Sequence, residues 1–290
     1  MRRFVKHILL FFVPMLILAI GCEIVVESIP NSYTYKYNYM EHHASSIQTL
    51  ILGSSYAYDG IAPSELPKAF NLANSSQTFE DDYCLLNRYL PVMDSLQTVI
   101  IAVGYGIWAD RSEQYRRLYY TVYMHLYPRW PISRFSFEIL NAKLLALKCI
   151  EYVESRDITR CDSLGHRTTH EASADLHIQA LVANDRINLQ AQRQDLETNF
   201  RYLHQMNDLC AERGIPFVVV AMPCHEQYRA SLPEDQIAMQ DSILSTLPFV
   251  IDASAWSIPD SGFYDATHLS RSQSIPFTRQ LADTIAEYCK

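Results

Sequence analysis

The stretch "QTLILGSSYAYDGI", residues 48–61, decides how the rest of the chain is interpreted. Its aliphatic run stops at Gly53, and two serines follow, Ser54 and Ser55. A continuous apolar run of this length is typical of a strand that is buried on both faces of a parallel sheet. Gly-Ser-Ser after such a strand is either an ordinary turn or a turn that presents a serine nucleophile at the edge of the sheet.

Four more apolar runs of the same kind follow, and amphipathic segments separate them. The strands are expected within 68–76, 97–104, 215–223 and 248–254, and helices at 79–96, 195–214, 234–247 and 270–290. This alternation predicts an α/β fold, a three-layer sandwich with a mostly parallel five-stranded sheet. Ligands of such sheets bind at the carboxyl ends of the strands. Those ends are Ser54–Ser55, Asn74–Ser76, Gly104–Gly106 and Pro223–Tyr228.

The N-terminus predicts a membrane anchor. Residues 8–26 are apolar except Cys22 and Glu23, and Arg2, Arg3 and Lys6 precede them. About 19 apolar residues suffice to cross a bilayer, and the positive-inside rule then places the N-terminus in the cytoplasm and the remainder outside it. Two alternatives stay open: a lipoprotein modified at Cys22 in "AIGC", and a cleaved signal peptide, although no clean small-x-small site is present. All three alternatives export the domain.

We expect three regions along the chain. Residues 1–27 form the cytoplasmic N-terminus and transmembrane anchor, and the polar, tyrosine-rich segment 28–46 is a juxtamembrane linker. Residues 47–290 form the α/β domain, with a helical insertion around 105–190. Tyrosines recur at four-residue intervals from Tyr115 to Tyr127, a spacing that favours packing along one helix face.

Composition excludes several classes of protein. The net charge is −8 and no basic stripe is present, so nucleic-acid binding is not expected. The seven cysteines include no C-x-x-C pair, so neither a zinc knuckle nor a thioredoxin-like site is indicated. We expect no metal and no cofactor.

The chemistry-bearing residues lie near the two ends of the α/β region. Asp265 and His268 are three residues apart, just before the last expected helix. A serine becomes a useful nucleophile when a base takes its proton and a carboxylate holds that base in the right tautomer. Asp265 and His268 can supply both groups from one short loop, and Ser55 completes the set.

This combination resembles the SGNH (GDSL-like) hydrolase superfamily, in particular its membrane-anchored members in the bacterial cell envelope. Its first block, Gly-Asp-Ser, corresponds to Gly53-Ser54-Ser55, with Ser54 in place of the aspartate. Its last block, D-x-x-H, matches residues 265–268 in full. The second block is matched in part by "NLANSS", residues 71–76. The third is matched by Gly104 alone, and Gly106 stands at the position of the oxyanion-hole asparagine.

The resemblance implies a flavodoxin-like sheet and a role for each matched residue. Ser55 is the expected nucleophile, His268 the base and Asp265 the group that orients the base. The backbone N–H groups of Ser55 and Ser76 and the side chain of Asn74 are the candidates for the oxyanion hole. Candidate substrate contacts on the same rim are Asp59, His225 and Glu226.

The expected function is that of a serine-dependent acyl esterase or O-acyltransferase. The resemblance implies an acylated, and specifically an acetylated, cell-envelope or capsular glycan as its substrate. It also implies the bacterial inner membrane as the location, with the domain in the periplasm. The alternative is a catalytically inactive SGNH-like envelope protein with a binding or assembly role, which the altered second and third blocks favour.

Overall fold

The structure, a computed structural model, describes residues 1–105, 114–169 and 193–288. It divides into two compact units. Unit 1 contains Met1–Tyr37 and Gln114–Thr159, and unit 2 contains Asn38–Glu113 and Arg160–Lys290. Gln114–Thr159, which lies within the segment expected as a helical insertion, groups with the N-terminal helix.

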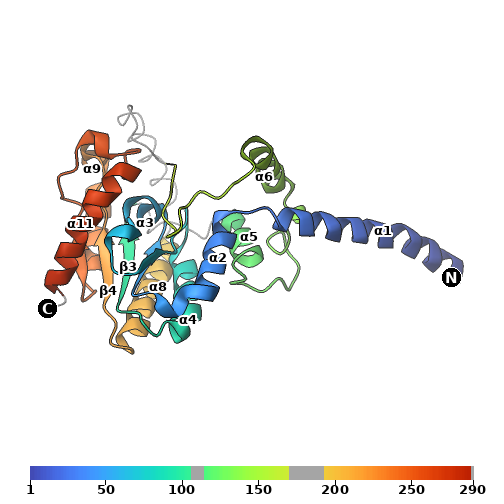
Figure 1. Ribbon diagram of the computed structural model, residues 1–290, viewed down its shortest axis with the longest axis horizontal. Coiled ribbons are helices and arrows are strands. Elements are labelled where there is room, and N and C mark those ends of the chain that lie inside the picture. The colour runs from blue at the N-terminus through green and yellow to red at the C-terminus, as the bar shows by residue number, and fades with distance from the viewer. Residues whose placement is uncertain (106–113, 170–192, 289–290) are drawn as a thin grey trace. The chain divides into compact units, whose positions relative to one another are not determined.

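Unit 2 is built on a five-stranded, all-parallel sheet with the order β2-β1-β3-β4-β5 (Figure 1). All five predicted strands are confirmed, and the sheet is parallel throughout rather than mostly parallel. Every residue of β1 and β4 is buried, as expected for a sheet covered on both faces. The strands are β1 Thr49–Gly53, β2 Ala69–Asn71, β3 Thr98–Val103, β4 Phe217–Ala221 and β5 Val250–Asp252.

Helices cover the sheet. Helices α3 and α11 contact each other, and α3 packs on β1 and β3, whereas α4 and α8 form a second pair that contacts β1 and β4. The helices of unit 2 are α3 Ser55–Gly60, α4 Phe79–Tyr89, α8 Arg193–Ala211, α9 Glu226–Ser231, α10 Glu234–Leu244 and α11 Arg271–Tyr288. Short 3-10 turns occur at Ala44–Ser46, Pro63–Glu65, Leu90–Val92 and Asp260–Gly262.

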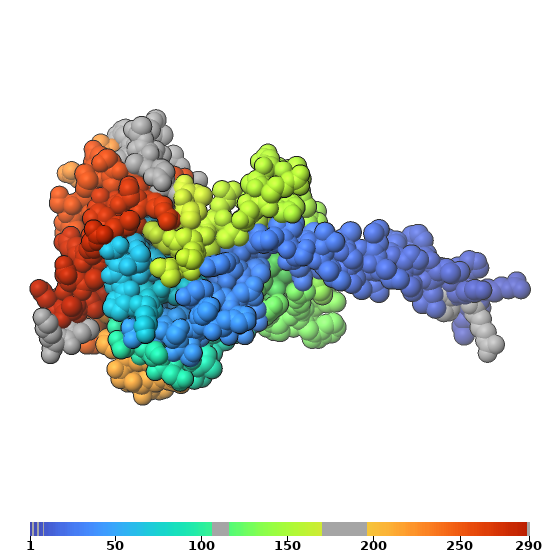
Figure 2. Space-filling model, viewed as in Figure 1, coloured from blue at the N-terminus to red at the C-terminus, as the bar shows by residue number. Residues whose placement is uncertain are grey.

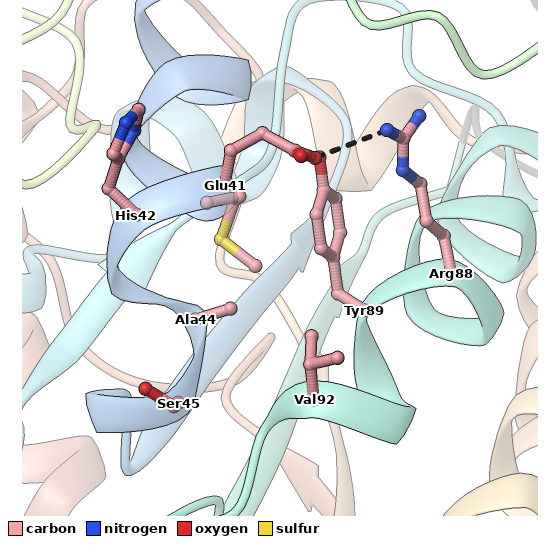
Figure 3. A pocket seen from close by; sticks show the side chains of 8 residues that line it. Glu41, His42, Ala44, Ser45, Arg88, Tyr89 and Val92 are labelled. Carbon is pink, nitrogen blue, oxygen red and sulfur yellow. Dashed lines mark hydrogen bonds and ion pairs between the residues drawn. The ribbon is translucent and has the colours of Figure 1, made fainter.

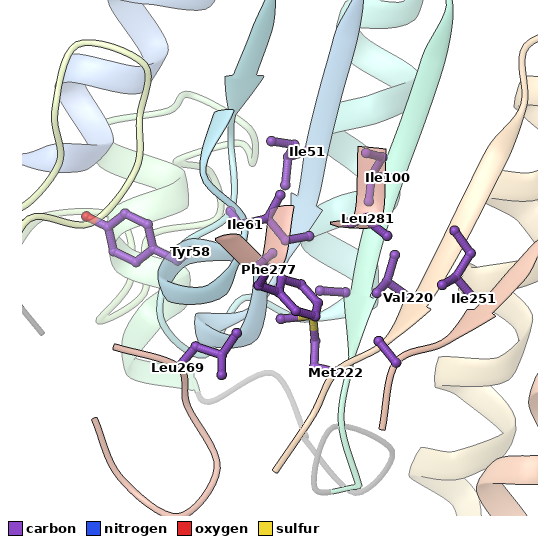
Figure 4. Close-up of a cluster of buried hydrophobic side chains, with 14 of the residues drawn as sticks. Ile51, Tyr58, Ile61, Ile100, Val220, Met222, Ile251, Leu269, Phe277 and Leu281 are labelled. Atoms are coloured by element: carbon purple, nitrogen blue, oxygen red, sulfur yellow. The ribbon is translucent and has the colours of Figure 1, made fainter. Parts of the chain in front are cut away.

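One half of the core lies between the sheet and the pair α3 and α11 (Figure 4). Alternate strand residues point to this face, because successive side chains of a strand point to opposite sides. Ile51, Ile100 and Val220 meet Phe277 and Leu281 of α11 there. Burial of this cluster stabilises the unit by roughly 25 cal/mol per Å² of apolar surface removed from water.

Unit 1 is helical. The tyrosines expected to pack along one helix face do so in part, since Tyr33 stacks on Tyr119 at 5.1 Å and Tyr119 stacks on Tyr123 at 6.0 Å between ring centroids. The expected linker 28–46 contains a helix, α2, because the apolar bodies of its tyrosines are packed rather than solvated. The elements are α1 Arg2–Glu27, α2 Ser32–His43 (which continues into unit 2), α5 Gln114–Val122, a 3-10 turn η5 Glu138–Leu140 and α6 Ala142–Ser155.

Helix α1 is long and apolar enough to cross a membrane. Its segment Leu9–Glu27 has 19 residues and a mean hydropathy of 2.6. A signal sequence meets the same criterion of length and composition. The large apolar side chains from Leu9 to Ile20 are exposed, and they lie on the blue helix of Figure 2.

Candidate active site

The sheet order places the candidate site at a topological switch point. From β1 the chain moves to β2 on one side, and β3, β4 and β5 follow on the other side. A crevice forms in such sheets beyond the carboxyl ends of the two strands where the direction reverses, here β1 and β3. Ser55 is the second residue after β1, and Gly104 directly follows β3.

The turn after β1 requires a glycine. Gly53 has a φ of +119°, and a Cβ at this position would lie 3.0 Å from the carbonyl oxygen of Ala102 on β3. Its N–H donates to Asp82 Oδ1 at 2.8 Å. The chain then passes through the extended Ser54, and Ser55 begins α3. Gly53 therefore lets the strand turn sharply, so that Ser55 leaves the sheet at its carboxyl edge.

A closed loop holds Asp265 and His268. Phe263 and Leu269 form an antiparallel bridge, and the N–H of Tyr264 donates to the carbonyl of His268 at 2.9 Å. Within the loop, Asp265 Oδ1 accepts from the N–H groups of Thr267 and His268 at 2.8 and 2.9 Å. This local turn is typical of aspartate, and it fixes the carboxylate before any contact with the imidazole is made.

Ser55, His268 and Asp265 form one hydrogen-bonded line. Ser55 Oγ lies 2.7 Å from His268 Nε2, although 213 positions separate the two residues in the sequence. His268 Nδ1 lies 2.8 Å from Asp265 Oδ1 and 2.9 Å from Oδ2. With Nδ1 facing the carboxylate, Nε2 is free to accept a proton from the serine hydroxyl, as a general base must.

The electrostatics of the line favour an ionised carboxylate and a basic imidazole. Burial opposes a charge on His268, but the charge of Asp265 and its hydrogen bond outweigh burial, so the pKa of His268 is raised. Asp59 adds to this rise, and Arg167 opposes it. Burial likewise opposes ionisation of Asp265, yet His268 and the hydrogen bonds from Thr267 hold the pKa of its carboxyl well below the usual range. Asp265 therefore stays charged and can stabilise an imidazolium.

Tyr56 supports the imidazole from one side. Its ring stacks on His268 at 5.2 Å between centroids, with 24° between the planes. A Cβ at Gly104 would lie 2.4 Å from this ring, so the space for Tyr56 depends on the glycine after β3. The glycine that the third sequence block singled out thus has a steric role beside the candidate base.

The predicted oxyanion-hole donors have different surroundings. The backbone N–H of Ser55 is at the start of α3, where N–H groups have no partner within the helix. Ser76 has a left-handed backbone with a φ of 54°. The amide of Asn74 donates to Gln77 Oε1 at 3.3 Å, so its side chain is engaged within its own loop. Gly106, expected at the position of an oxyanion-hole asparagine, lies outside the described residues.

A buried chain of hydrogen bonds joins this loop to the nucleophile turn. Asn74 donates to Gln77, Gln77 Nε2 donates to Asp82 Oδ1 at 2.5 Å, and Asp82 accepts from Gly53 as well. Burial raises the pKa of Asp82 to about 7, even though the two hydrogen bonds that it accepts oppose the shift. The sequence analysis missed Asp82, which appears in the sequence only as one of three acidic residues in the first turn of α4.

Arg167 is a second residue that the sequence analysis missed. Its Nη1 lies 3.0 Å from Asp59 Oδ2, its Nη2 donates to Ser75 Oγ, and its guanidinium stacks over the Tyr58 ring at 4.4 Å. Asp59, expected as a substrate contact, is only 2% exposed and binds this arginine. Arg167 thus ties α3 to the loop that carries Ser76.

The other two expected substrate contacts are on the rim after β4. His225 caps α9, its backbone N–H donates to the Ala266 carbonyl at 2.9 Å, and its Nε2 lies 3.2 Å from Asp260 Oδ1. The ring is buried and packs edge-on against Phe263, at the start of the Asp265–His268 loop, at 5.6 Å between centroids. Glu226 is exposed to solvent.

A separate cavity of about 360 Å³ lies at the opposite edge of unit 2 (Figure 3). Three of its polar side chains are joined, since Glu41 Oε1 lies 3.1 Å from both Arg88 Nη2 and Tyr89 Oη. The segments that line it precede β1 and β3, which places it at the amino ends of the strands, away from Ser55. It is lined by Met40, Glu41, His42, Ala44, Ser45, Arg88, Tyr89 and Val92.

Across the described residues, no three His, Cys, Asp or Glu side chains gather in a way that could hold a metal ion. A scan against protein-family models and a search of curated proteins both give no match to this chain.

Proposed function

We propose that the protein is a serine-dependent esterase or O-acyltransferase, with Ser55 as nucleophile, His268 as general base and Asp265 as the orienting carboxylate. One observation carries the proposal: Ser55 Oγ is 2.7 Å from His268 Nε2, while Nδ1 of the same ring is 2.8 Å from Asp265. Nucleophile, base and orienting group are within hydrogen-bond reach in the order that acyl transfer requires.

The reaction has two balanced halves. Ser55 Oγ attacks the ester carbonyl carbon, its proton passes to His268 Nε2, and the alcohol leaves with that proton, so that an acyl-serine forms. Water or a sugar hydroxyl then loses its proton to His268 and attacks the acyl carbon. The proton returns to Ser55 as the acyl group departs. Hydrolysis and transfer differ only in this second acceptor.

The substrate class rests on resemblance and expected location. The SGNH-like order of Gly53-Ser54-Ser55 and of the D-x-x-H block, together with an N-terminal helix able to span a membrane, supports an acylated envelope or capsular glycan outside the cytoplasm. The acyl group proposed is acetyl. Neutral imidazole is the active base, so the rate should rise with pH through the raised pKa of His268.

The test uses a fluorophosphonate probe, which reacts covalently with activated serines, on the full chain in detergent. The wild type should be labelled, Ser55→Ala should not, and the matched control Ser54→Ala should be labelled like the wild type. Hydrolysis of a simple acetyl ester should follow the same order. Labelling of Ser55→Ala would contradict the assignment of the nucleophile.

The altered second and third blocks favour a second candidate, a non-catalytic envelope protein that keeps the fold. It predicts no labelling of the folded wild type by any serine probe and no effect of Ser55→Ala on a binding function. Labelling of the wild type is by itself enough to exclude this second candidate.

A further inference from the structure

An apolar patch lies on the surface of unit 1, outside the proposed active site. Between 48% and 76% of each of its side chains is exposed. Single apolar residues on a surface need no explanation, but several large ones in one small unit that also holds a helix able to span a membrane indicate an interaction surface. The patch consists of Trp130, Ile132, Leu140, Leu147, Ile150 and Val153.

Helix α6 exposes three aliphatic residues and buries a lysine. Leu147, Ile150 and Val153 are three residues apart, so they lie on one face, and that face is exposed. The buried side chain of the helix is Lys148, which donates to the Val26 carbonyl at 2.7 Å and lies 3.1 Å from Glu138 Oε1. A helix in water buries its aliphatic face and exposes its lysines. The outward face of α6 is therefore suited to an apolar environment.

The end of α1 is built into the same unit. Glu23 Oε1 and Oε2 accept from the N–H groups of Glu138 and Ile139 at 2.8 and 3.0 Å. Glu27 pairs with Arg129 at 2.7 Å, directly before Trp130 in the sequence. Cleavage after α1 would leave these backbone and side-chain groups without partners, so the structure favours a chain that keeps this end of the helix. A chain modified at Cys22 would keep it as well.

These contacts set the depth of the patch. The 19 residues Leu9–Glu27 rise about 28 Å, close to the roughly 30 Å of a bilayer core, so a span begun at Leu9 ends near Glu27. Residues 138–139 lie at the level of Glu23, which is one turn before that end. The patch therefore begins at the boundary between acyl chains and headgroups. Tryptophan is enriched at this boundary, and the exposed Arg134 and Lys143 suit lipid phosphates.

We propose that this apolar patch lies in the headgroup–acyl boundary of the bilayer that α1 enters, so that unit 1 is a membrane-seated base for the chain. The occupant of the patch is lipid. This inference does not depend on the proposed chemistry of Ser55, because every residue that carries it belongs to unit 1.

The test is quenching of Trp130 by lipid in full chains with a single tryptophan. The Trp108→Phe/Trp256→Phe chain keeps Trp130 only, and the Trp108→Phe/Trp130→Phe chain keeps Trp256, which packs on Phe277 in the core of unit 2. Both are reconstituted in phosphatidylcholine vesicles with plain or 6,7-brominated acyl chains. Brominated lipid should lower the emission of Trp130 about twofold or more, and should leave Trp256 nearly unchanged.

A variant with Leu147→Gln, Ile150→Gln and Val153→Gln should lose at least half of the Trp130 quenching. Val92→Gln, which alters an exposed apolar residue of unit 2, is the matched control and should lose none. Circular dichroism checks that each variant remains folded. Two results would overturn the proposal. One is equal quenching of both tryptophans. The other is a Trp130 that brominated lipid does not quench in a correctly inserted chain. If native membranes nevertheless shield that Trp130 from acrylamide, a protein partner covers the patch instead of lipid.

Discussion

Two pairs of opposite charge, one in each unit, have similar distances between their charged atoms and different surroundings. His268 lies 2.8 Å from Asp265 in unit 2, and Lys148 lies 3.1 Å from Glu138 in unit 1. The first pair is partly open, with side chains 19% and 28% exposed, whereas the second is closed at 3% and 2%. His268 also contacts the hydroxyl of Ser55, while Lys148 contacts the carbonyl of Val26 and the hydroxyl of Tyr123.

This difference separates a pair that can take part in chemistry from one that holds the structure together. An open pair that ends on a hydroxyl can pass a proton to and from a substrate. A closed pair in which the ammonium already has three acceptors has no free position for a ligand. Substitutions should therefore affect activity in the first pair and stability in the second.

The largest expected effect is that of Asp265→Asn. The amide leaves the geometry almost intact, but it cannot hold His268 in the tautomer with Nε2 unprotonated. We expect kcat/KM for an acetyl ester to fall about 10⁴-fold, with little change in the free energy of unfolding. Steady-state kinetics and a thermal melt of the same preparation measure both quantities.

The pH profile provides the control for this variant. Asp265 raises the pKa of His268, so the pH at which activity appears should move down in Asp265→Asn. A variant that loses stability as much as activity would show that Asp265 is a structural residue, and the contrast between the two pairs would then disappear.

Next in size is Lys148→Met in unit 1. Removing the ammonium leaves the carboxylate of Glu138 buried without its cation, which typically costs about 3–5 kcal/mol in the free energy of unfolding. Chemical unfolding of the full chain in detergent measures this loss, and turnover per folded molecule should stay the same.

The double variant Lys148→Met/Glu138→Gln is the matched control. It removes both charges and should recover most of the lost stability. A large drop in turnover per folded molecule in Lys148→Met would contradict a purely structural role for the closed pair.

The sequence predicted the open pair better than the closed one, because local sequence patterns determine the residues of the open pair. Local sequence patterns determine the parts of the open pair's site. An apolar run forms β1, a glycine allows the turn at residue 53, and an aspartate closes the loop that carries His268. Arg167 has no local signal, because its partners Asp59 and Ser75 are 108 and 92 positions away. Its contribution to the site is visible only in three dimensions.

Unit 1 escaped the sequence analysis for a different physical reason. The usual rule assigns apolar residues to the interior and charges to the surface, and this rule fails in α6, where Lys148 is buried and Ile150 is exposed. The rule also made the tyrosine-rich segment before β1 look like a solvated linker, although α2 packs Tyr33 on Tyr119.

A third test concerns a buried carboxyl that is not paired with a cation, Asp82 beneath Gly53. Its pKa is raised to about 7 from an ordinary value of 3.8, so the folded state holds a proton that the unfolded state has lost between these pH values. The stabilisation from the protonated Asp82 is therefore fully present below about pH 4 and is lost as the pH rises through about 7.

Asp82→Asn should remove this dependence on pH. Near pH 4 the variant and the wild type should unfold at similar free energies, and above pH 7 the variant should be more stable by about 2 kcal/mol. This gain is smaller than the full shift implies, because the neutral amide accepts weaker hydrogen bonds from Gly53 and Gln77. Unfolding curves at pH 4 and 7.5 measure the difference, and a variant that is less stable at both values would contradict the assigned pKa.

The smallest expected effect is that of Ser54→Ala. This variant compares two neighbouring serines, one that contacts the open pair and one that does not. Ser54 is 3% exposed and sits at the N-cap of α3, but its side chain makes no capping hydrogen bond, whereas Ser55 Oγ contacts His268. Removal of a hydroxyl that makes a hydrogen bond within the protein typically costs about 1 kcal/mol. Because Ser54 has no capping bond to lose, Ser54→Ala should change the free energy of unfolding by no more than about 0.5 kcal/mol.

Labelling of Ser54→Ala by a serine probe should remain at the wild-type level, because the backbone path from Gly53 to Ser55 does not depend on this hydroxyl. A loss of labelling in Ser54→Ala with unchanged stability would place Ser54 in the chemistry and would require a different division of roles between the two serines.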